Sequence, residues 1–265
     1  MIIRMSVFIS NLTRFGLTRQ GAILGKQIQS IISLQSVDRT LKTSSPCQNK
    51  VYEMRQYVIK PDGVQEYKKL TQELFYLRTR ASKLVGFWFT EIGSLLNKTV
   101  HLWEYDSLMH RQEVRDALAN DSEWQNNYIA NLVRLVQEQQ NCTMYMPQWY
   151  SEVKSPEKQS GGVYELMTYN MVMGGPVIWG KKLKSSIEAH VRLGYADLIG
   201  VWYTDIGDHN SVEVLWRYNN LTCREEGRER AHNDAVVVNK VRDNLDNVTH
   251  HTSCLMLPST WSPMQ

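Results

Sequence analysis

Several features are absent from this 265-residue sequence, and each absence excludes a class of protein. No apolar stretch approaches the roughly 18 to 20 residues that a bilayer-spanning helix needs, so we expect no transmembrane segment. The four cysteines are widely spaced and form no CxxC pair, so neither a zinc site nor a small disulfide framework is indicated. The GxGxxG, P-loop, GxSxG and HExxH motifs are also missing. We therefore predict no metal, no cofactor and no catalytic residue.

Acidic residues are missing from the first 37 positions, which are rich in Ser and Thr and carry spaced Arg residues. Residues 1–50 hold seven basic residues and one acid, a net charge of +6; because the whole chain carries +3, the remainder carries −3. Nucleic-acid binding requires Lys and Arg clustered on the folded part, which is mildly acidic, so we predict no nucleic-acid partner. The head instead has the composition of an organelle transit peptide.

The apolar residues of the head recur at three- and four-residue steps, which would gather them on one face of a helix: Met1, Met5, Phe8, Leu12 and Phe15. A cationic amphipathic helix suits mitochondrial import, whereas a secretory signal needs a longer uninterrupted apolar run. We predict that residues 1–46 are a transit peptide or a disordered segment, and that the protein is mitochondrial, in the matrix or peripheral. A cytosolic protein with a basic tail is the alternative.

What the sequence does contain is an internal repeat. Residues 51–57 (VYEMRQY) return as 163–169 (VYELMTY), an offset of 112, and residues 84–93 (LVGFWFTEIG) return as 198–207 (LIGVWYTDIG), an offset of 114. Because several blocks recur in the same order at nearly one offset, the chain is a tandem duplication of a unit of about 100 residues, the size of a small domain. The predicted boundaries are 47–150 for the first repeat, 151–162 for a linker and 163–265 for the second repeat.

Both repeats have the same predicted order of elements: strand, helix, strand, strand, helix, strand. Aromatic and β-branched runs predict the strands, and apolar residues at three- and four-residue spacing predict the helices. In the first repeat the elements are a strand at 51–59, a helix at 64–84, strands at 85–92 and 99–105, a helix from a cap at Ser107 to about 136, and a strand at 143–149. In the second they are a strand at 163–171, a helix that includes Leu183, Ile187 and Val191, strands at 199–206 and 212–218, a helix at 221–248 and a strand at 253–258.

This order is the split βαβ, or ferredoxin-like, arrangement of the α+β class, an antiparallel sheet with helices on one face. In the first strand, alternation places Tyr52 and Met54 on one side and Val51 and Tyr57 on the other, so both faces gain from burial. One face can take the helices, and the other can meet the second repeat. We therefore predict two tandem ferredoxin-like units that form a closed barrel of the dimeric α/β type within one chain.

Longer motifs in both halves carry a family resemblance. The first half contains VYEMR (51–55), GFWFTEIG (86–93) and VHLWEYD (100–106), and the second contains Gly174-Gly175-Pro176 with Trp179. With these motifs, residues 51–265 resemble the NIPSNAP family, most closely its third subgroup. The resemblance implies a tandem dimeric α/β barrel, association with mitochondria, and a role in mitochondrial quality control (mitophagy) or vesicular transport. It carries over no catalytic residues, because the family has no agreed catalytic motif.

Four tryptophans occupy equivalent strand positions in the two repeats: Trp88, Trp103, Trp202 and Trp216. Aromatic walls offer large contact area to a planar ligand, so these side chains are candidates to line a pocket. The alternative is that they fill the core or the interface between the repeats.

Three further side chains are candidates for chemistry in that pocket. Glu91 and Asp205 are equivalent carboxylates at strand ends and could form an acid/base pair if burial raises one pKa; exposed rim carboxylates are the alternative. His101 lies in the middle of a strand and is a candidate axial haem ligand, or simply a packed strand histidine.

One tetrapeptide of the linker region, Tyr150-Ser151-Glu152-Val153, fits the loose aromatic-x-x-aliphatic pattern that adds a strand to ubiquitin-like modifiers. Tyr150 and Val153 are therefore candidate anchors for a protein partner. The pattern is permissive, and it also occurs inside predicted strands.

We favour a non-enzymatic mitochondrial interaction protein, whose partners are other proteins and which has no transmembrane segment. Peripheral membrane association and homo-oligomer formation stay open. The alternative is a small-molecule binder, for haem or another hydrophobic ligand, or a monooxygenase-like enzyme that uses the barrel interior.

The location can be tested with the head alone. A reporter fused to residues 1–45 should enter mitochondria, because the cationic amphipathic segment carries the import information. Microscopy of the fusion measures this, with the unfused reporter as the control. A diffuse cytosolic signal would contradict the prediction.

Overall fold

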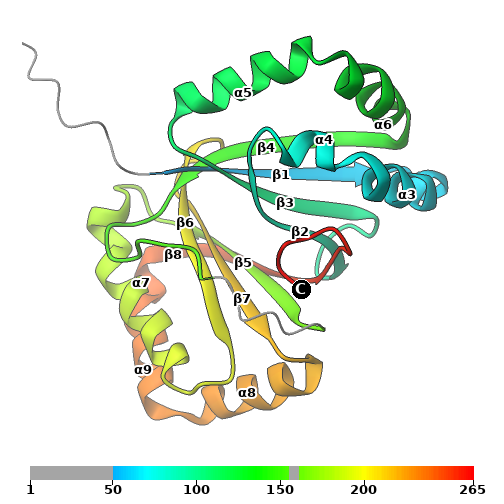
Figure 1. The fold of residues 1–265 in the computed structure, drawn as a ribbon. Helices are drawn as coiled ribbons and strands as arrows, with labels where there is room; N and C mark the ends of the chain where they lie inside the picture. Colours follow the sequence, from blue (N-terminus) through cyan, green and yellow to red (C-terminus); the bar gives the residue numbers. More distant parts are fainter. Residues whose placement is uncertain (1–49, 155–160) are drawn as a thin grey trace, which may run out of the picture. The chain divides into compact units, whose positions relative to one another are not determined.

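The computed structural model of the protein describes residues 50–154 and 161–265, which lie within one compact unit, Gln48–Gln265. The predicted transit segment, and residues 155–160 of the predicted linker, lie outside the described residues. Figure 1 shows the course of the described chain.

The two repeats have the predicted order of elements. The first contains β1 (Val51–Ile59), η2 (Pro61–Gly63), α3 (Val64–Leu74), α4 (Tyr76–Thr79), β2 (Lys83–Ile92), β3 (Lys98–Tyr105), α5 (Leu108–Asn120), the π-helical η3 (Trp124–Ile129), α6 (Ala130–Leu135) and β4 (Val136–Tyr145). The second contains β5 (Val163–Met171), α7 (Pro176–Val191), β6 (Asp197–Ile206), β7 (Ser211–Tyr218), α8 (Leu221–Asn233), α9 (Ala235–Asn244), η4 (Leu245–Asn247) and β8 (Val248–Pro258).

Side-chain caps begin α5 and α8 at the positions where the sequence predicts these helices to start. Ser107 accepts a hydrogen bond from the backbone N–H of His110 at 3.0 Å, which confirms the predicted cap of α5. Asn220 plays the same part for α8, accepting from the N–H of Cys223 at 2.8 Å. Each cap satisfies one of the N–H groups that the first turn of a helix leaves without a partner.

The predicted start of the last strand is wrong in both repeats, although the helical segment before it ends close to the predicted residue, at Leu135 and at Asn247. In the first repeat the strand begins at Val136, and in the second it begins at Val248, several residues before the predicted start. The early part of each strand is polar, so its sequence does not indicate a strand. It pairs along its length with the first strand of its own repeat, β4 with β1 and β8 with β5, and this pairing overrides local propensity.

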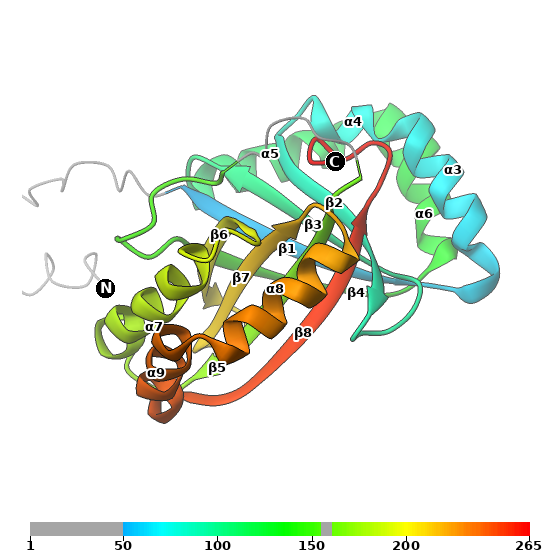
Figure 2. The same cartoon turned by 90° about the horizontal axis from the view of Figure 1, so that it is seen from below.

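The eight strands form one closed barrel in the order β1-β3-β2-β8-β5-β7-β6-β4, which confirms the predicted fold (Figures 1 and 2). Two antiparallel pairs join the repeats. In the first pair, β2 meets β8, with Trp88 opposite Pro258. In the second, β4 meets β6, with Tyr145 opposite Tyr203. Because each repeat supplies the neighbour that the other lacks, neither sheet keeps an open edge.

Alternation along the strands separates an inner core from two outer cores. Tyr52 and Met54 point into the barrel with Trp88 and Trp202, whereas Val51 packs against the helices of the first repeat. A third cluster joins the second sheet to its own helices. The helices of the two repeats cover different sides of the barrel (Figure 1).

A buried carboxylate recurs at the same place in both repeats. Glu53 accepts hydrogen bonds from Arg111 at 2.6 Å and from the hydroxyl of Tyr105 at 3.2 Å. Glu165 accepts the equivalent bonds from Arg224 at 2.6 Å and from the hydroxyl of Tyr218 at 2.7 Å. The arginine bonds link β1 to α5 and β5 to α8, and the tyrosine bonds link β1 to β3 and β5 to β7.

Both carboxylates are fully buried, so they depend on these partners. Burial alone would raise the pKa of Glu165, but hydrogen bonds from Arg224, Ser253 and Tyr218 bring it below its usual value. Burial would also raise the pKa of Glu53, but hydrogen bonds from Arg111 and Asn141 and the charge of Arg55 bring that pKa below its usual value.

Replacing Arg224 with Met leaves the Glu165 carboxylate buried without its charged partner, so the free energy of unfolding should fall by about 3 to 5 kcal/mol. Arg230→Met, at an exposed position of α8, should change it by no more than about 0.5 kcal/mol. Because the pKa of Glu165 is lowered, the contribution should be full at neutral pH and should be lost as the pH falls through that lowered pKa. Urea unfolding at neutral and acidic pH measures both effects; equal stability of Arg224→Met and the wild type at neutral pH would contradict them.

Candidate functional site

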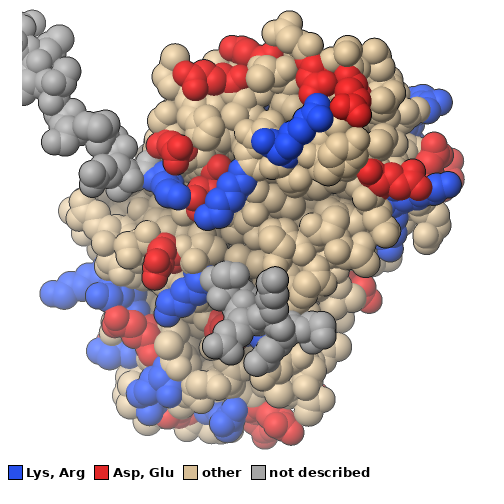
Figure 3. All heavy atoms as spheres, in the orientation of Figure 1, with Lys and Arg blue, Asp and Glu red and all other residues tan. Residues whose placement is uncertain are grey.

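A binding site is easier to locate in the barrel interior than on the outer surface. On the face shown in Figure 3, Lys and Arg side chains are interspersed with Asp and Glu. Charge alone therefore distinguishes no surface on that face. The barrel interior, in contrast, contains a cavity.

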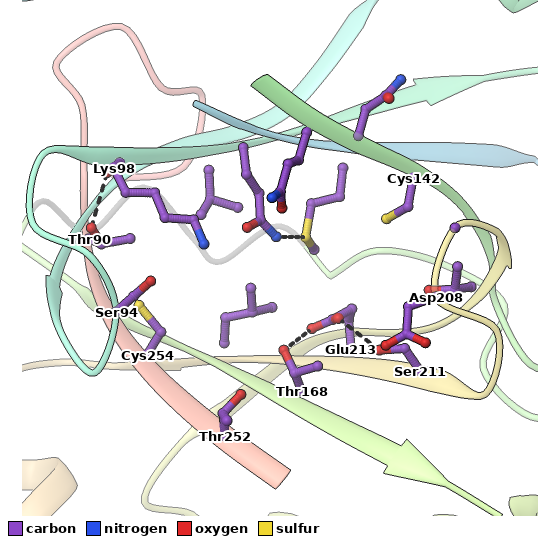
Figure 4. Close-up of a pocket in the computed structure, with 18 of the residues that line it drawn as sticks. Thr90, Ser94, Lys98, Cys142, Thr168, Asp208, Ser211, Glu213, Thr252 and Cys254 are labelled. Carbon is purple, nitrogen blue, oxygen red and sulfur yellow. Dashed lines mark hydrogen bonds between the residues drawn. The ribbon is translucent and has the colours of Figure 1, made fainter. Parts of the chain in front are cut away.

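This cavity, which we call the mouth cavity, lies inside the barrel at the end where the β2–β3 and β6–β7 loops are found. Its volume is about 350 Å³. Figure 4 shows the side chains that converge on it from strands of both repeats. They include Gln56, Lys98, Cys142, Thr168, Asp208, Ser211, Glu213 and Cys254. Most of these groups are hydroxyls, amides or ionisable groups, so the cavity is equipped to bind a polar molecule.

Glu213 is the buried carboxyl group of the mouth cavity. It lies on β7 opposite Thr168 of β5, whose hydroxyl donates to it at 2.6 Å, and Ser211 donates at 3.3 Å (Figure 4). Burial raises the pKa of Glu213 to about 7, although these hydrogen bonds and the charge of Lys98 act in the opposite direction. At neutral pH the group therefore exchanges readily between the acid and the carboxylate, and can donate or accept a proton.

Glu213 is not among the candidate residues predicted from the sequence, although comparison of the two repeats indicates it. The corresponding residue of the first repeat is Val100, which also faces the interior. A carboxylate in place of a valine, at an inward-facing position of a buried strand, is a departure from the repeat that packing alone does not explain.

Two cysteines occupy equivalent positions in the mouth cavity, Cys142 on β4 and Cys254 on β8. Burial raises the pKa of the Cys142 thiol to about 12, and that of Cys254 is raised as well. Both groups are therefore protonated thiols at neutral pH, which are weak nucleophiles.

The four predicted tryptophans do not line one pocket. Trp88 and Trp202 point into the barrel and fill the end away from the mouth cavity, with ring centroids 5.4 Å from Tyr164 and 5.7 Å from Tyr52 respectively. Trp103 and Trp216 point outward into the two helix layers. The strand register explains the difference, because successive residues of a strand face opposite sides.

The glycine two residues before each inner tryptophan makes room for the indole ring. A Cβ atom on Gly86 would lie 2.1 Å from the ring of Trp88, and one on Gly200 would lie 2.0 Å from the ring of Trp202. The Gly-x-Trp pattern of both repeats is therefore a packing device, and the closed end of the barrel is filled by these two rings.

Glu91 and Asp205 lie near the barrel end, but neither lines the mouth cavity. Glu91 is exposed and Asp205 is half-buried. They are therefore not placed as an acid/base pair of that cavity, and Glu213 supplies the carboxyl group there.

His101 faces the helix layer of the first repeat. It is only 3% exposed, its ring stacks on Phe87 at 4.8 Å between centroids, and its Nδ1 accepts a hydrogen bond from the indole N–H of Trp103 at 2.7 Å. Burial, followed by the charges of Arg55 and Arg78, lowers the pKa of His101 well below its usual value, so it is neutral. The ring lines the smaller cavity of this helix layer, where its Nε2 has no hydrogen-bond partner. His101 therefore lies outside the barrel interior, in which the sequence predicts a haem ligand.

Tyr150 and Val153 are already engaged with the second repeat. The Tyr150 hydroxyl donates to the backbone carbonyl of Leu198 at 3.1 Å, and Val153 packs against the inner core. The N–H of Lys154 donates to the carbonyl of Ile199 at 2.9 Å. The predicted partner motif is therefore docked beside β6 and is not a free strand.

Two kinds of feature are absent from the part of the chain that the structure describes. Within residues 50–154 and 161–265, no three His, Cys, Asp or Glu side chains form a cluster that could hold a metal ion. Within the same ranges, no helix has the length and apolarity to cross a bilayer.

The fold and its cavity define a class, the dimeric α/β barrels, here with both halves fused in one chain. A crystal structure of a putative monooxygenase from Lactobacillus acidophilus NCFM has a similar fold, with a TM-score of 0.58 over 80% of this chain and 95% of that one. Sequence identity is 8%, so the similarity is one of fold alone.

The family follows from the sequence comparisons. The NIPSNAP family model matches residues 52–151 and 164–263. Protein NipSnap homolog 3A of Homo sapiens is 38% identical over 214 residues, which are 81% of this chain and 85% of that protein. Protein NipSnap homolog 3B of Homo sapiens is 39% identical over 215 residues with the same coverage. This chain belongs to the NIPSNAP family.

The raised pKa of Glu213 predicts a pH-dependent stability. The folded protein holds this proton more tightly than the unfolded chain, so the free energy of unfolding should fall as the pH rises from about 4.5 to about 7 and then level off. Relative to the wild type, Glu213→Gln should gain about 3 kcal/mol across that window, since it has no charge to bury. Urea unfolding at intervals of pH measures this.

Glu213→Val, which introduces the residue of the first repeat, should show the same slope as Glu213→Gln. A difference from the wild type that is independent of pH for both variants would contradict the raised pKa.

Proposed function

We propose that this protein acts by binding and not by catalysis, and that its barrel takes up a small polar molecule in the mouth cavity. The observation that carries the proposal is Glu213, a buried carboxyl group that faces this cavity in one repeat only. A buried ionisable group in a concave site is a common mark of function, because packing alone does not favour it.

The side chains around Glu213 indicate the chemistry of the ligand. Thr168 and Ser211 already donate to the carboxyl group, and Lys98 and Asp208 line the same cavity. The remaining polar groups are neutral hydroxyls and amides, which favour a neutral or cationic molecule with several hydrogen-bond donors. A ligand that donates to Glu213 would stabilise its carboxylate and release its proton.

We also propose a location in mitochondria and a role in the cell. The acid-free, Arg-containing head supports a mitochondrial protein. Membership of the NIPSNAP family supports a role in mitochondrial quality control or vesicle traffic, as the sequence resemblance implies.

A second candidate function is contact with other proteins at the rim of the mouth cavity. Four large apolar side chains are exposed there, on the β2 and β6 ends and the β2–β3 loop: Ile92, Leu95, Leu96 and Ile206. Exposed apolar groups beside a cavity favour a protein contact. Proximity labelling in mitochondria with the wild type and with Leu95→Ser/Leu96→Ser tests this role; an identical set of labelled proteins would contradict it.

The binding proposal is tested by ligand-observed NMR with the full chain and a panel of small polyols, amides and primary amines. At least one member should bind the wild type, and the affinity should fall at least about tenfold in Glu213→Val, which removes the carboxyl group without adding volume. Glu91→Gln is the matched control, because this carboxylate is exposed and lies outside the cavity.

Retention of binding by Glu213→Val, or equal losses in Glu213→Val and Glu91→Gln, would contradict the assignment of the site. Failure of the whole panel to bind the wild type would favour the rim contact over the cavity.

A further inference from the structure

A second cavity lies outside the barrel, between the sheet of the second repeat and helices α7, α8 and α9. Its volume is about 600 Å³, within the range of small-molecule sites. Met167 and Trp216 contribute from the sheet, Leu183 and Ile187 from α7, and Val237 from α9. We call it the helix-layer cavity. Figures 1 and 2 show the three helices beside this sheet.

The first repeat has a matching cavity of about 290 Å³, less than half as large. An ion pair that occurs in both repeats aligns the two layers: Arg80 with Asp121 at 2.6 Å, and Arg192 with Asp234 at 2.7 Å. Both aspartates also cap the helical segment that follows them. Residues can therefore be compared one by one between the layers.

Loss of aromatic side chains accounts for the larger volume. Asp121 accepts from the N–H of Trp124, and Asp234 accepts the equivalent bond from Val237, so Trp124 and Val237 occupy the same position. Counted from the arginine of the same ion pair, Phe75 corresponds to Ile187. Two aromatic rings of the first layer are thus replaced by small aliphatic groups in the second.

The first repeat also has one residue more in this helical segment. Asp121 precedes the start of its last strand by 15 positions, from 121 to 136, whereas Asp234 precedes its own by 14, from 234 to 248. The π-helical turn η3 accommodates the extra residue, and it brings Tyr128 into the layer, stacked on Trp124 at 4.6 Å. In α9 the insertion is absent, and the space stays open.

The charges around the helix-layer cavity have one sign. Among the described residues that line it there is no Asp or Glu, whereas Arg228 and Arg242 do line it. Neither arginine forms an ion pair with a carboxylate of the described residues. Both guanidinium groups carry a permanent charge and are suited to bind a carboxylate.

We propose that the helix-layer cavity binds a free long-chain carboxylate. The acyl chain would lie among Leu183, Ile187, Val237 and Trp216, and the carboxylate would pair with Arg228 and Arg242 at the edge. An apolar volume bordered by unpaired positive charge complements a molecule with an apolar body and one anionic end. This site is separate from the mouth cavity and does not depend on its function.

The test uses the full chain and cis-parinaric acid, a carboxylate that fluoresces in apolar surroundings. Fluorescence should rise saturably with one site per chain, and palmitate should displace the probe. Hexadecanol, which has a similar chain but no charge, should displace it less effectively, because it gains nothing from the arginines.

Variants that restore the first repeat should close the cavity. Val237→Trp and Ile187→Phe should each weaken parinarate binding at least about tenfold. Val236→Trp, at the exposed neighbouring position of α9, is the matched control and should bind as the wild type does. Ala231→Leu, which introduces the Leu118 of the first repeat, is a smaller filling variant if the aromatic ones unfold.

The anionic end is tested separately. Arg228→Gln should weaken palmitate binding about tenfold and leave hexadecanol binding unchanged, since only the charged hydrogen bond is lost. Arg115→Gln, at the corresponding position of the first repeat, is the matched control and should alter neither.

Three results would overturn the proposal. The first is unchanged binding by the folded Val237→Trp, Ile187→Phe and Ala231→Leu variants. The second is equal competition by palmitate and hexadecanol with no effect of Arg228→Gln. The third is a protein that binds vesicles of anionic phospholipid but no free palmitate, which would indicate a membrane surface instead of a cavity ligand.

Discussion

Closure of the barrel is the constraint on which the rest of this structure depends. A four-stranded ferredoxin-like sheet has two open edges and one face without helices, so a single repeat leaves hydrogen-bonding groups and apolar side chains uncovered. The β2–β8 and β4–β6 pairs resolve both problems at once, since they join the edges and bring the inner faces together. The filled end around Trp88 and Trp202, and the open end with the mouth cavity, both exist only because the two repeats close on each other.

The residues that stabilise the fold are the same in both repeats, whereas the residues that define the two cavities differ between them. The buried carboxylates Glu53 and Glu165 have equivalent arginine and tyrosine partners, as expected of groups required to form either half. The two cavities, in contrast, depend on differences between the halves. Glu213 stands where the first repeat has a valine, and Val237 stands where it has a tryptophan. Both halves therefore share the buried interactions that stabilise the fold and differ at the individual positions that shape the cavities.

The sequence predicts the duplication because several blocks recur in the same order at nearly one offset. It predicts the closed barrel because both faces of the first strand carry residues that gain from burial. It did not predict the polar starts of β4 and β8, since pairing with a distant strand forms them and local propensity does not. Their equivalent places in the repeat predict that the four tryptophans share one pocket, whereas strand parity turns Trp103 and Trp216 toward the helices. Glu213 could have been found as a departure from the repeat, but its burial and partners depend on strands distant in sequence.

The mouth cavity holds a buried carboxyl group whose pKa, about 7, prepares it to exchange a proton at neutral pH. The most direct test is an NMR titration of the side-chain carboxyl carbon of Glu213 in the folded full chain, labelled with carbon-13 and assigned with Glu213→Gln. We expect a midpoint at about pH 7. A midpoint near the 4.5 of an ordinary glutamate would contradict it.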